Sequence, residues 1–356
     1  MTDPHKSSSI TKETSAQQIE LTQSFRIDHL RLIPSKRQVL STGQIRVKLS
    51  HSALNYRDLM MVKGQYNPRQ ALPLVPCSDG AGVITESFGN SQWNCGERVI
   101  PLFSQNWIEG SPGRHVTDST LGGPLQGTLR SEAIFDENGV VEVPSYLSNA
   151  EASTLGCAAL TAWSALVELG KIKNGDQVLC IGTGGVSLFA AQIAAMLGAK
   201  VVLISRSIGK LEQVMNHPEM SRFSSSISPM YTPSGEQWGA SVKKNFGEID
   251  HVIEVGGAGT LTESLRVVKA GGVVSLIGVL AGGGGELNLT PVLMRQIRIQ
   301  GVIVGHKEGL KRMLKAFETH TLRPIIDHHH FGFHEAREAF KYIESAQHIG
   351  KVVIQH

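Results

Sequence analysis

The sequence predicts an α/β protein with two domains, one mostly β and one built on a doubly wound parallel sheet. Its 356 residues are many for a single core, and a 41% share of hydrophobic residues is enough to bury two. Short β-like runs separated by Gly, Pro and Asn fill residues 17–150. Beyond 149, strand-like and helix-like segments alternate, which is typical of a parallel sheet covered by helices on both faces.

The N-terminal part is expected to be a compact, mostly-β domain that follows a loosely held arm. Residues 1–20 are polar and rich in Ser and Thr, without the apolar run of a signal peptide. Helical periodicity is nearly absent from there to 150. The strands that we expect here are QIRVKLSHSAL, GAGVITE, ERVIPLF and GVVEVP.

The middle of the chain is expected to form the parallel sheet. An Asn cap candidate at 149 and a small-residue helix open it, and one irregular strand is expected within 216–247. Helices are expected at SLFAAQIAAMLG, from 208 and from 260. The expected strands are QVLCIG, VVLIS, IDHVIEV, GVVSLIGV and IRIQGVIV.

The last 50 residues are too short for a third domain. Two helices, KEGLKRMLKAFET and HEAREAFKYIESA, alternate there with two expected strands, LRPIID and GKVVIQ. We expect these strands to return and complete the N-terminal domain. The predicted domains are therefore 1–152 with 305–356, and 153–304.

Composition indicates a small-molecule substrate as the partner. Lys and Arg number 34 against 31 Asp and Glu, which provides neither a basic field for nucleic acid nor a polybasic stretch for a membrane surface. No stretch of about 18 apolar residues occurs. The four cysteines are widely spaced without a CxxC pair, which favours a reducing, cytoplasmic location.

A glycine fingerprint follows the strand QVLCIG and opens the next helix. The run is Gly182-Thr183-Gly184-Gly185-Val186-Ser187. Gly182 permits a tight turn, Gly184 permits close approach of a pyrophosphate, and the helix N-terminus attracts its charge. Ser187 replaces the third glycine with another small residue. The setting favours a dinucleotide-binding Rossmann domain over a glycine-rich turn without a ligand.

The end of the second strand indicates NADP(H) rather than NAD(H). An NAD site places Asp or Glu there to bind the ribose 2′-hydroxyl, and no acid is present. Ser205, Arg206, Ser207 and Lys210 instead offer hydroxyls and cations suited to a 2′-phosphate. The alternative interpretation of Arg206 is a solvated side chain at a strand end.

The ordered motifs carry a family resemblance from about residue 17 to 356. They are NYRDLMMVKGQY, SDGAGVI, GERV, GGPLQGTLRSEAIF, CAALTAWSAL, GTGGVS and GKVVI. The chain resembles the medium-chain dehydrogenase/reductase superfamily, and within it the zinc-independent, quinone-oxidoreductase-like branch. The resemblance implies a GroES-like domain built from both chain ends, an inserted Rossmann domain, and cofactor in the cleft between them.

The resemblance also bears on zinc. The positions of the three catalytic zinc ligands in alcohol dehydrogenases look like Asn55, Ser78 and Cys157 here. One thiol does not make the three N/S ligands that catalytic zinc requires, so no metal is expected there. The four-cysteine structural zinc lobe is missing too, since only Cys95 lies in that region.

Without zinc, alcohol oxidation loses its electrostatic support, whereas an activated acceptor needs only positioning and hydrogen-bond donors. We therefore expect NADPH-dependent reduction of quinones or α,β-unsaturated carbonyls. A zinc-free NADP-dependent alcohol or aldehyde oxidoreductase and a non-catalytic NADPH-binding sensor remain alternatives.

The resemblance implies further site residues. Tyr56 and Tyr66 are candidate proton donors, and Asn55 is a candidate for orienting a substrate oxygen. Tyr56 has the alternative of a cleft-wall aromatic. Thr161 matches a family residue near the nicotinamide, or it bonds only its own backbone. Cofactor contacts are also expected where successive strands end at the carboxyl edge of the sheet, at Gly256, Gly278 and Val279.

Three other features carry expectations. The loop 104–127 is long enough to rim the substrate cleft. His328-His329-His330 suggest metal, but neighbours in a strand alternate faces, which favours a surface strand end. Family members commonly dimerise through an edge strand of the Rossmann sheet, and GVVSLIGVL is the expected edge of a homodimer.

Overall fold

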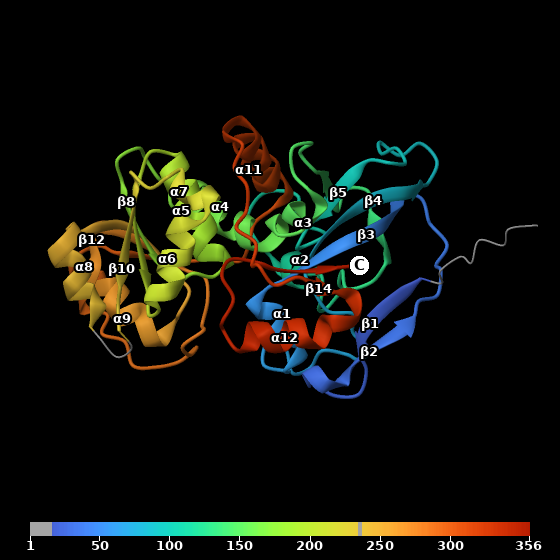
Figure 1. Cartoon of the computed structure of the whole chain (residues 1–356), viewed down its shortest axis with the longest axis horizontal. Helices are drawn as coiled ribbons and strands as arrows, with labels where there is room; N and C mark the ends of the chain where they lie inside the picture. Colours follow the sequence, from blue (N-terminus) through green and yellow to red (C-terminus); the bar gives the residue numbers. More distant parts are fainter. Residues whose placement is uncertain (1–15, 234–236) are drawn as a thin grey trace, which may run out of the picture.

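The computed structural model describes residues 16–233 and 237–356. Two lobes lie side by side, and one of them contains segments from both ends of the chain (Figure 1). Residues 1–15 of the predicted arm and residues 234–236 of the weakly patterned stretch lie outside the described residues. The architecture is α/β, with a GroES-like β domain and a Rossmann domain, as the sequence predicts. The exact domain boundaries stay predictions.

The β domain is built on a seven-stranded sheet with the order β14-β15-β3-β4-β5-β7, with β6 also paired to β3. Its last long strand comes from the C-terminus, where Val352 pairs antiparallel with Leu54, so the predicted return of the chain is confirmed. A separate hairpin joins β1 to β2. The strands are β1 (Gln17–Leu21), β2 (Leu30–Pro34), β3 (Gln44–Leu54), β4 (Asp79–Ser87), β5 (Arg98–Pro101), β6 (Glu132–Asp136), β7 (Val140–Glu142), β14 (Phe331–Gly332) and β15 (Val352–Gln355).

The strand predicted at LRPIID is wrong. These residues form only a single bridge, between Ile326 and Lys351, and β14 begins later at Phe331. Pro324 has no N–H to give to a ladder, which explains why this apolar run does not extend into a strand. The three histidines at 328–330 therefore lie in a loop before β14 and not in a strand.

The Rossmann sheet is parallel throughout, with the order β10-β9-β8-β11-β12-β13. Alternate residues of β8 enter different cores, Val178 and Cys180 on one face and Leu179 on the other. Burial on both faces explains why these strands read as continuous apolar runs. The strands are β8 (Gln177–Ile181), β9 (Lys200–Ser205), β10 (Ile227–Tyr231), β11 (Ile249–Glu254), β12 (Val268–Leu276) and β13 (Arg298–Gly301).

The order of this sheet corrects the expected dimer edge. β12, which contains most of GVVSLIGVL, pairs with β11 on one side and with β13 on the other. The outer strands are β10 and β13. β12 is therefore an inner strand, and it offers no free backbone groups to a second copy.

The helix predicted from 149 begins one residue earlier than expected. Its cap is Ser148, whose Oγ accepts the N–H of Glu151 at 3.2 Å while the Glu151 carboxylate accepts the Ser148 N–H at 2.7 Å. It continues from α3 (Asn149–Ala152) through α4 (Leu160–Trp163), with π-helical turns at 155–159 and 164–169. The stretch 216–247 contains the expected strand, β10, and also two helices that the sequence did not indicate, α7 (Pro218–Ser221) and α8 (Trp238–Phe246).

The remaining helices cover the sheets. α12 packs beside α1 although the two lie near opposite ends of the chain (Figure 1). None of the described helices is both long and apolar enough to cross a membrane. The helices are η1 (Ile27–His29), α1 (Tyr56–Val62), α2 (Arg114–Thr117), α5 (Gly185–Met196), α6 (Ile208–Asn216), α7 (Pro218–Ser221), α8 (Trp238–Phe246), α9 (Ala258–Val267), α10 (Thr290–Met294), α11 (Lys307–His320), η4 (Phe333–Glu335) and α12 (Ala336–Glu344).

Candidate cofactor and active site

The glycine loop joins β8 to α5 and leaves room for a ligand. Gly182 has φ +83°, a conformation that favours glycine. A Cβ added at Gly182 or at Gly184 would meet nothing within 4 Å. Gly184 is the N-cap of α5, and no side chain caps that end. Open space in front of the helix N-terminus, with backbone donors not used by a cap, fits a pyrophosphate group.

The next residues of the loop are packed tightly. A Cβ at Gly185 would lie 2.7 Å from Cδ of Lys351, so the lysine stem requires glycine here. Ser187 is buried, and its hydroxyl donates to the carbonyl of Ile181 at 2.6 Å. This bond from the helix back to the strand end explains how serine serves at the third glycine position.

The end of β9 presents Ser205, Arg206 and Ser207 together. The Ser205 hydroxyl accepts the N–H of Ser207 at 3.2 Å, and Ser207 caps α6 by accepting the N–H of Lys210 at 3.3 Å. These bonds order the turn that carries Arg206. The Arg206 side chain is exposed and has no hydrogen bond or ion pair with any residue that the structure describes. Its guanidinium is available for a phosphate.

Lys210 lies near this turn but has other partners. Its ammonium donates to the carbonyls of Ala346 at 2.5 Å and His348 at 3.2 Å, which belong to the C-terminal segment. Burial lowers the pKa of Lys210. The lysine bridges the two parts of the chain, and its contact with a 2′-phosphate stays a prediction.

The carboxyl ends of β11 and β12 form one packed rim. Ala281 N–H donates to Gly256 O at 2.7 Å, and Ala258 N–H donates to Gly282 O at 2.9 Å. A Cβ at Gly278 would lie 2.4 Å from Val255 O, so the close approach of the two loops requires glycine. Gly256, Gly278 and the exposed Val279 are thus brought together at this edge, and their contact with a cofactor stays a prediction.

Sequence reasoning missed the residue that shapes this rim. The carboxylate of Glu254 is fully buried and accepts the N–H of Gly256 at 2.7 Å and of Gly257 at 3.0 Å. Hydroxyl donors come from Thr260, at 2.5 Å, and Ser264. An acid at the end of a buried strand, followed by two glycines and two hydroxyl residues, was the available signal.

A buried polar cluster lies beside the glycine loop. Lys351 donates to the carbonyl of Leu54 at 2.9 Å, to Asp79 Oδ2 at 3.3 Å, and to Asn55 Oδ1. The Asn55 amide donates to Ser78 Oγ at 3.2 Å and to Asp79 Oδ2 at 2.9 Å. Both N–H groups of Asn55 are engaged, so its catalytic role stays a prediction. Sequence reasoning missed Asp79 and Lys351.

The electrostatics of this cluster are those of a buried ion pair. Asp79 and Lys351 are 1% and 2% exposed. Burial raises the pKa of Asp79, against the opposing effects of Lys351 and of the hydrogen bond from Asn55. Burial and the Asp79 charge also raise the pKa of the Cys157 thiol, which keeps it protonated at neutral pH. Thr161 is buried and donates to Cys157 O at 2.7 Å, the local backbone bond that was its alternative interpretation.

Of the two candidate tyrosines, Tyr56 begins α1 and Tyr66 follows that helix, and both are accessible. Tyr56 is 43% and Tyr66 47% exposed, and neither hydroxyl has a hydrogen-bond partner within the described parts of the chain. Arg57 lies over the Tyr66 ring at 4.8 Å and donates to the carbonyls of Leu121 and Gly123 at 2.7 and 3.0 Å. Arg57 therefore ties the 104–127 loop to α1.

The first part of the 104–127 loop is held against the start of α11. The N–H groups of Lys307 and Glu308, which begin α11, donate to Trp107 O at 3.0 Å and to Ile108 O at 3.1 Å. The buried Trp107 ring meets His306 edge to face at 5.7 Å. These bonds order the loop, and its place at the substrate cleft stays a prediction.

The fold and the site together define a nicotinamide-dependent oxidoreductase with a GroES-like and a Rossmann domain. Residues 41–145 match the family described as the alcohol dehydrogenase GroES-like domain, and residues 185–319 match the zinc-binding dehydrogenase family. The chain is 38% identical, over 331 residues, to a zinc-type alcohol dehydrogenase-like protein of Schizosaccharomyces pombe, with 89% of this chain and 92% of the relative covered. It therefore belongs to the medium-chain dehydrogenase/reductase superfamily.

Two further similarities agree with this assignment. A 2-methylene-furan-3-one reductase of Solanum lycopersicum is 28% identical over 323 residues, with 88% of this chain and 72% of the relative covered. A solved structure from Sinorhizobium meliloti, provisionally described as an alcohol dehydrogenase, is 33% identical with a TM-score of 0.86, covering 96% of this chain and 98% of its own.

Proposed function

We propose that the protein is a zinc-independent, NADPH-dependent reductase of quinones or α,β-unsaturated carbonyl compounds. The observation that carries the proposal is the buried Lys351 ammonium, which contacts Asn55 and Asp79 beside Ser78. These are the positions, or the neighbours of positions, at which zinc-dependent relatives would hold their metal by resemblance. The Lys351 ammonium thus supplies a positive charge at the place where those relatives would hold the metal ion.

The donor set supports the absence of catalytic zinc. Asn55 offers a carboxamide and Ser78 a hydroxyl, and neither is a ligand type of ordinary catalytic zinc sites. The remaining candidate, Cys157, is a thiol whose raised pKa opposes the thiolate form that binds metal. A divalent ion would also have to displace or repel the neighbouring Lys351 ammonium.

The proposed acceptor follows from this chemistry. Bound NADPH would supply hydride, and an activated double bond or quinone accepts it without Lewis-acid help. The reductase from Solanum lycopersicum, whose name describes reduction of such an enone, supports the choice. Tyr56 and Tyr66 are the proposed proton donors, because their hydroxyls are accessible and unpartnered in the described structure. Asn55 would hold the adjoining cluster, and it would orient the substrate oxygen by giving up its hydrogen bond to Ser78 or to Asp79.

The proposed cofactor is NADP(H), bound from the glycine loop to the end of β9. The free Arg206 and the ordered Ser205 and Ser207 support a 2′-phosphate site. Lys210 would also bind the phosphate once its ammonium leaves the carbonyls of Ala346 and His348. The residues proposed for the pyrophosphate and nicotinamide halves are Thr161, Gly182, Thr183, Gly184, Gly185, Val186, Gly256, Gly278 and Val279.

Activity with and without chelator tests the proposal. NADPH oxidation should proceed with a simple enone and a quinone, and should be unchanged after dialysis against a strong chelator. NADP+ reduction with simple alcohols, without enone turnover, would favour the alcohol oxidoreductase instead. Tight NADPH binding without turnover of any acceptor would leave only the sensor alternative.

A homodimer is proposed through the outer strand β13 of the Rossmann sheet. Its outer edge has no strand partner among the described residues and needs a partner or protection. Exposed apolar residues precede it at Leu289, Leu293 and Met294. We expect a dimeric mass by light scattering, and a shift toward the monomer in Leu293→Glu. Ile208→Glu is the matched control, because Ile208 is an exposed apolar residue of α6, which packs against β10 at the other edge of the sheet. This variant should stay dimeric. A monomeric wild-type mass would contradict this proposal.

We also place the protein in the reducing cytoplasm. Cys77, Cys95, Cys157 and Cys180 are all free, and three of them are buried. An oxidising compartment would put the exposed Cys95 at risk of intermolecular pairing.

A further inference from the structure

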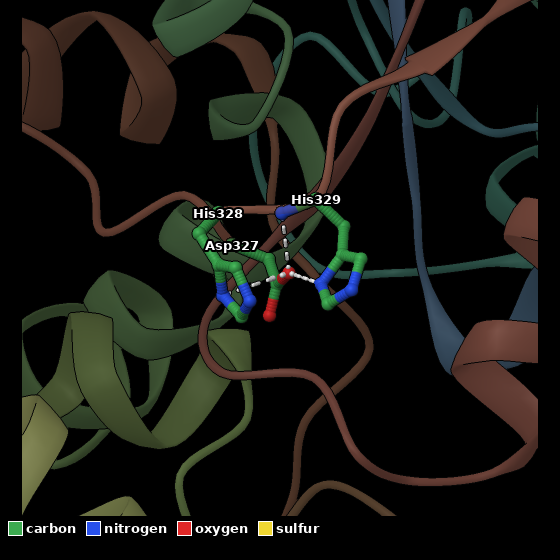
Figure 2. A group of neighbouring side chains, drawn as sticks. All are labelled: Asp327, His328 and His329. Carbon is green, nitrogen blue, oxygen red and sulfur yellow. Dashed lines mark hydrogen bonds and ion pairs between the residues drawn. The ribbon is translucent and has the colours of Figure 1, made fainter.

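Asp327, His328 and His329 converge in the loop before β14. Figure 2 shows the two imidazoles on either side of the carboxylate, each turning a nitrogen toward it. The Asp327 Oδ1 atom lies 3.6 Å from Nδ1 of His328 and 3.1 Å from Nδ1 of His329, and all the possible ligand atoms lie within 4.8 Å of one another. Because this loop is not a strand, neighbouring side chains need not alternate between faces.

We propose that these three residues bind a divalent transition-metal ion such as Zn²⁺. Imidazole nitrogen and carboxylate oxygen are ordinary zinc ligands, with bonds of about 2.0–2.2 Å. Tetrahedral ligands at that bond length stand about 3.4 Å apart, close to the spacing of both imidazoles from the carboxylate. The two imidazoles would turn from their present contacts with Oδ1 toward the ion, and water would complete the coordination.

The surrounding contacts hold the carboxylate in place. Asp327 is buried, and its Oδ2 atom accepts the N–H of Ile349 at 2.7 Å. The N–H of His329 and the hydroxyl of Tyr342 donate to Oδ1 at 2.9 and 3.2 Å. Supporting hydrogen bonds of this kind orient a metal ligand before the ion arrives. The two imidazoles are exposed, which leaves the site open to solution.

The site adjoins the segment that supports the cofactor loop. The Asp327 N–H donates to Lys351 O at 2.8 Å, and the Gly350 N–H donates to Thr183 O at 2.9 Å. An ion here would therefore brace the chain between Asp327 and Lys351. The inferred role is structural, and the inference does not rest on the proposed reductase activity.

The test is metal binding by the full chain after removal of metal with a chelator. Calorimetric titration with Zn²⁺ should find one ion per chain, and the ion should raise the melting temperature. His329→Ala should weaken this binding by at least about tenfold, since even supporting residues of metal sites contribute that much. His330→Ala is the matched control, because His330 is exposed, adjacent and outside the ligand group, and it should bind as wild type does.

Titration with Co²⁺ distinguishes this site from the cleft. The spectrum of the bound ion should lack a thiolate charge-transfer band, and Cys157→Ala should leave the affinity unchanged. The inference is overturned if millimolar Zn²⁺ does not bind, if His329→Ala and His330→Ala bind equally, or if Cys157 proves to be a ligand. Both histidines of the site are exposed, so their variants should fold and keep the comparison valid.

Discussion

Arg206→Ala should raise the dissociation constant for NADPH by about 10- to 100-fold while leaving that for NADH unchanged. A hydrogen bond to a charged group contributes about 1.5–3 kcal/mol, and 1.4 kcal/mol is a factor of ten. The loss is confined to NADPH because only this cofactor carries the 2′-phosphate. Since the Arg206 side chain has no hydrogen bond or ion pair with the described residues, removing it breaks neither kind of interaction. Fluorescence titration with each cofactor measures both constants.

Two matched variants control for charge. Arg206→Lys keeps the cation but loses the planar fork, so it should recover only part of the NADPH affinity. Arg69→Ala removes another exposed arginine, from the other domain, and should leave both constants unchanged. Equal losses for NADPH and NADH in Arg206→Ala would mean that the residue shapes the loop instead of recognising the 2′-phosphate.

The parts of the fold that were predictable depend on local patterns. The strands β8 and β9 are buried on both faces, so their sequences are continuous apolar runs between glycine-marked turns. Such runs do not indicate the order in which the strands lie in the sheet. Both β12 and β13 were expected as strands, but only hydrogen bonding across the sheet shows that β13 lies outside β12. The same limit explains the wrong edge for the dimer.

The candidate site likewise has a part that local sequence patterns predict and a part that they do not. The glycine loop from 182 to 187 is contiguous, so its residues were found together. The cluster of Asn55, Asp79 and Lys351 joins positions up to 296 residues apart, and no local pattern pairs them. One local sign did exist, since a lysine directly before the apolar run of β15 must have its charge satisfied when that strand is buried.

Lys351→Met should lower the free energy of unfolding by about 3–5 kcal/mol, because it leaves the Asp79 carboxylate buried without its cation. Methionine retains much of the apolar stem that packs against Gly185, so the loss is electrostatic more than steric. Urea unfolding at neutral pH measures the change. Lys244→Met, at an exposed position without partners in the described structure, is the control and should have little effect.

The deficit of Lys351→Met should depend on pH in a defined direction. Burial already raises the pKa of Asp79, and loss of the opposing Lys351 charge raises it further. A carboxyl group with a raised pKa in the folded state binds its proton more tightly when the protein is folded. Its contribution to stability is therefore fully present below the pKa of the unfolded state, and it is lost as pH rises through the pKa of the folded state. The variant should therefore lie closest to wild type in acid, and its deficit should grow toward neutral pH.

The double variant Lys351→Met with Asp79→Asn separates the value of the ion pair from the cost of breaking it. Neutralising both partners removes the unpaired buried charge, and such replacements are often neutral or stabilising. We therefore expect the double variant to recover most of the stability and to lose the pH dependence. If Lys351→Met alone stays within about 1 kcal/mol of wild type at neutral pH, either solvent reaches Asp79 or its carboxyl is already protonated in the folded protein. In both cases Lys351 would not be the partner of a buried carboxylate, and the argument that it takes the place of a metal would fail.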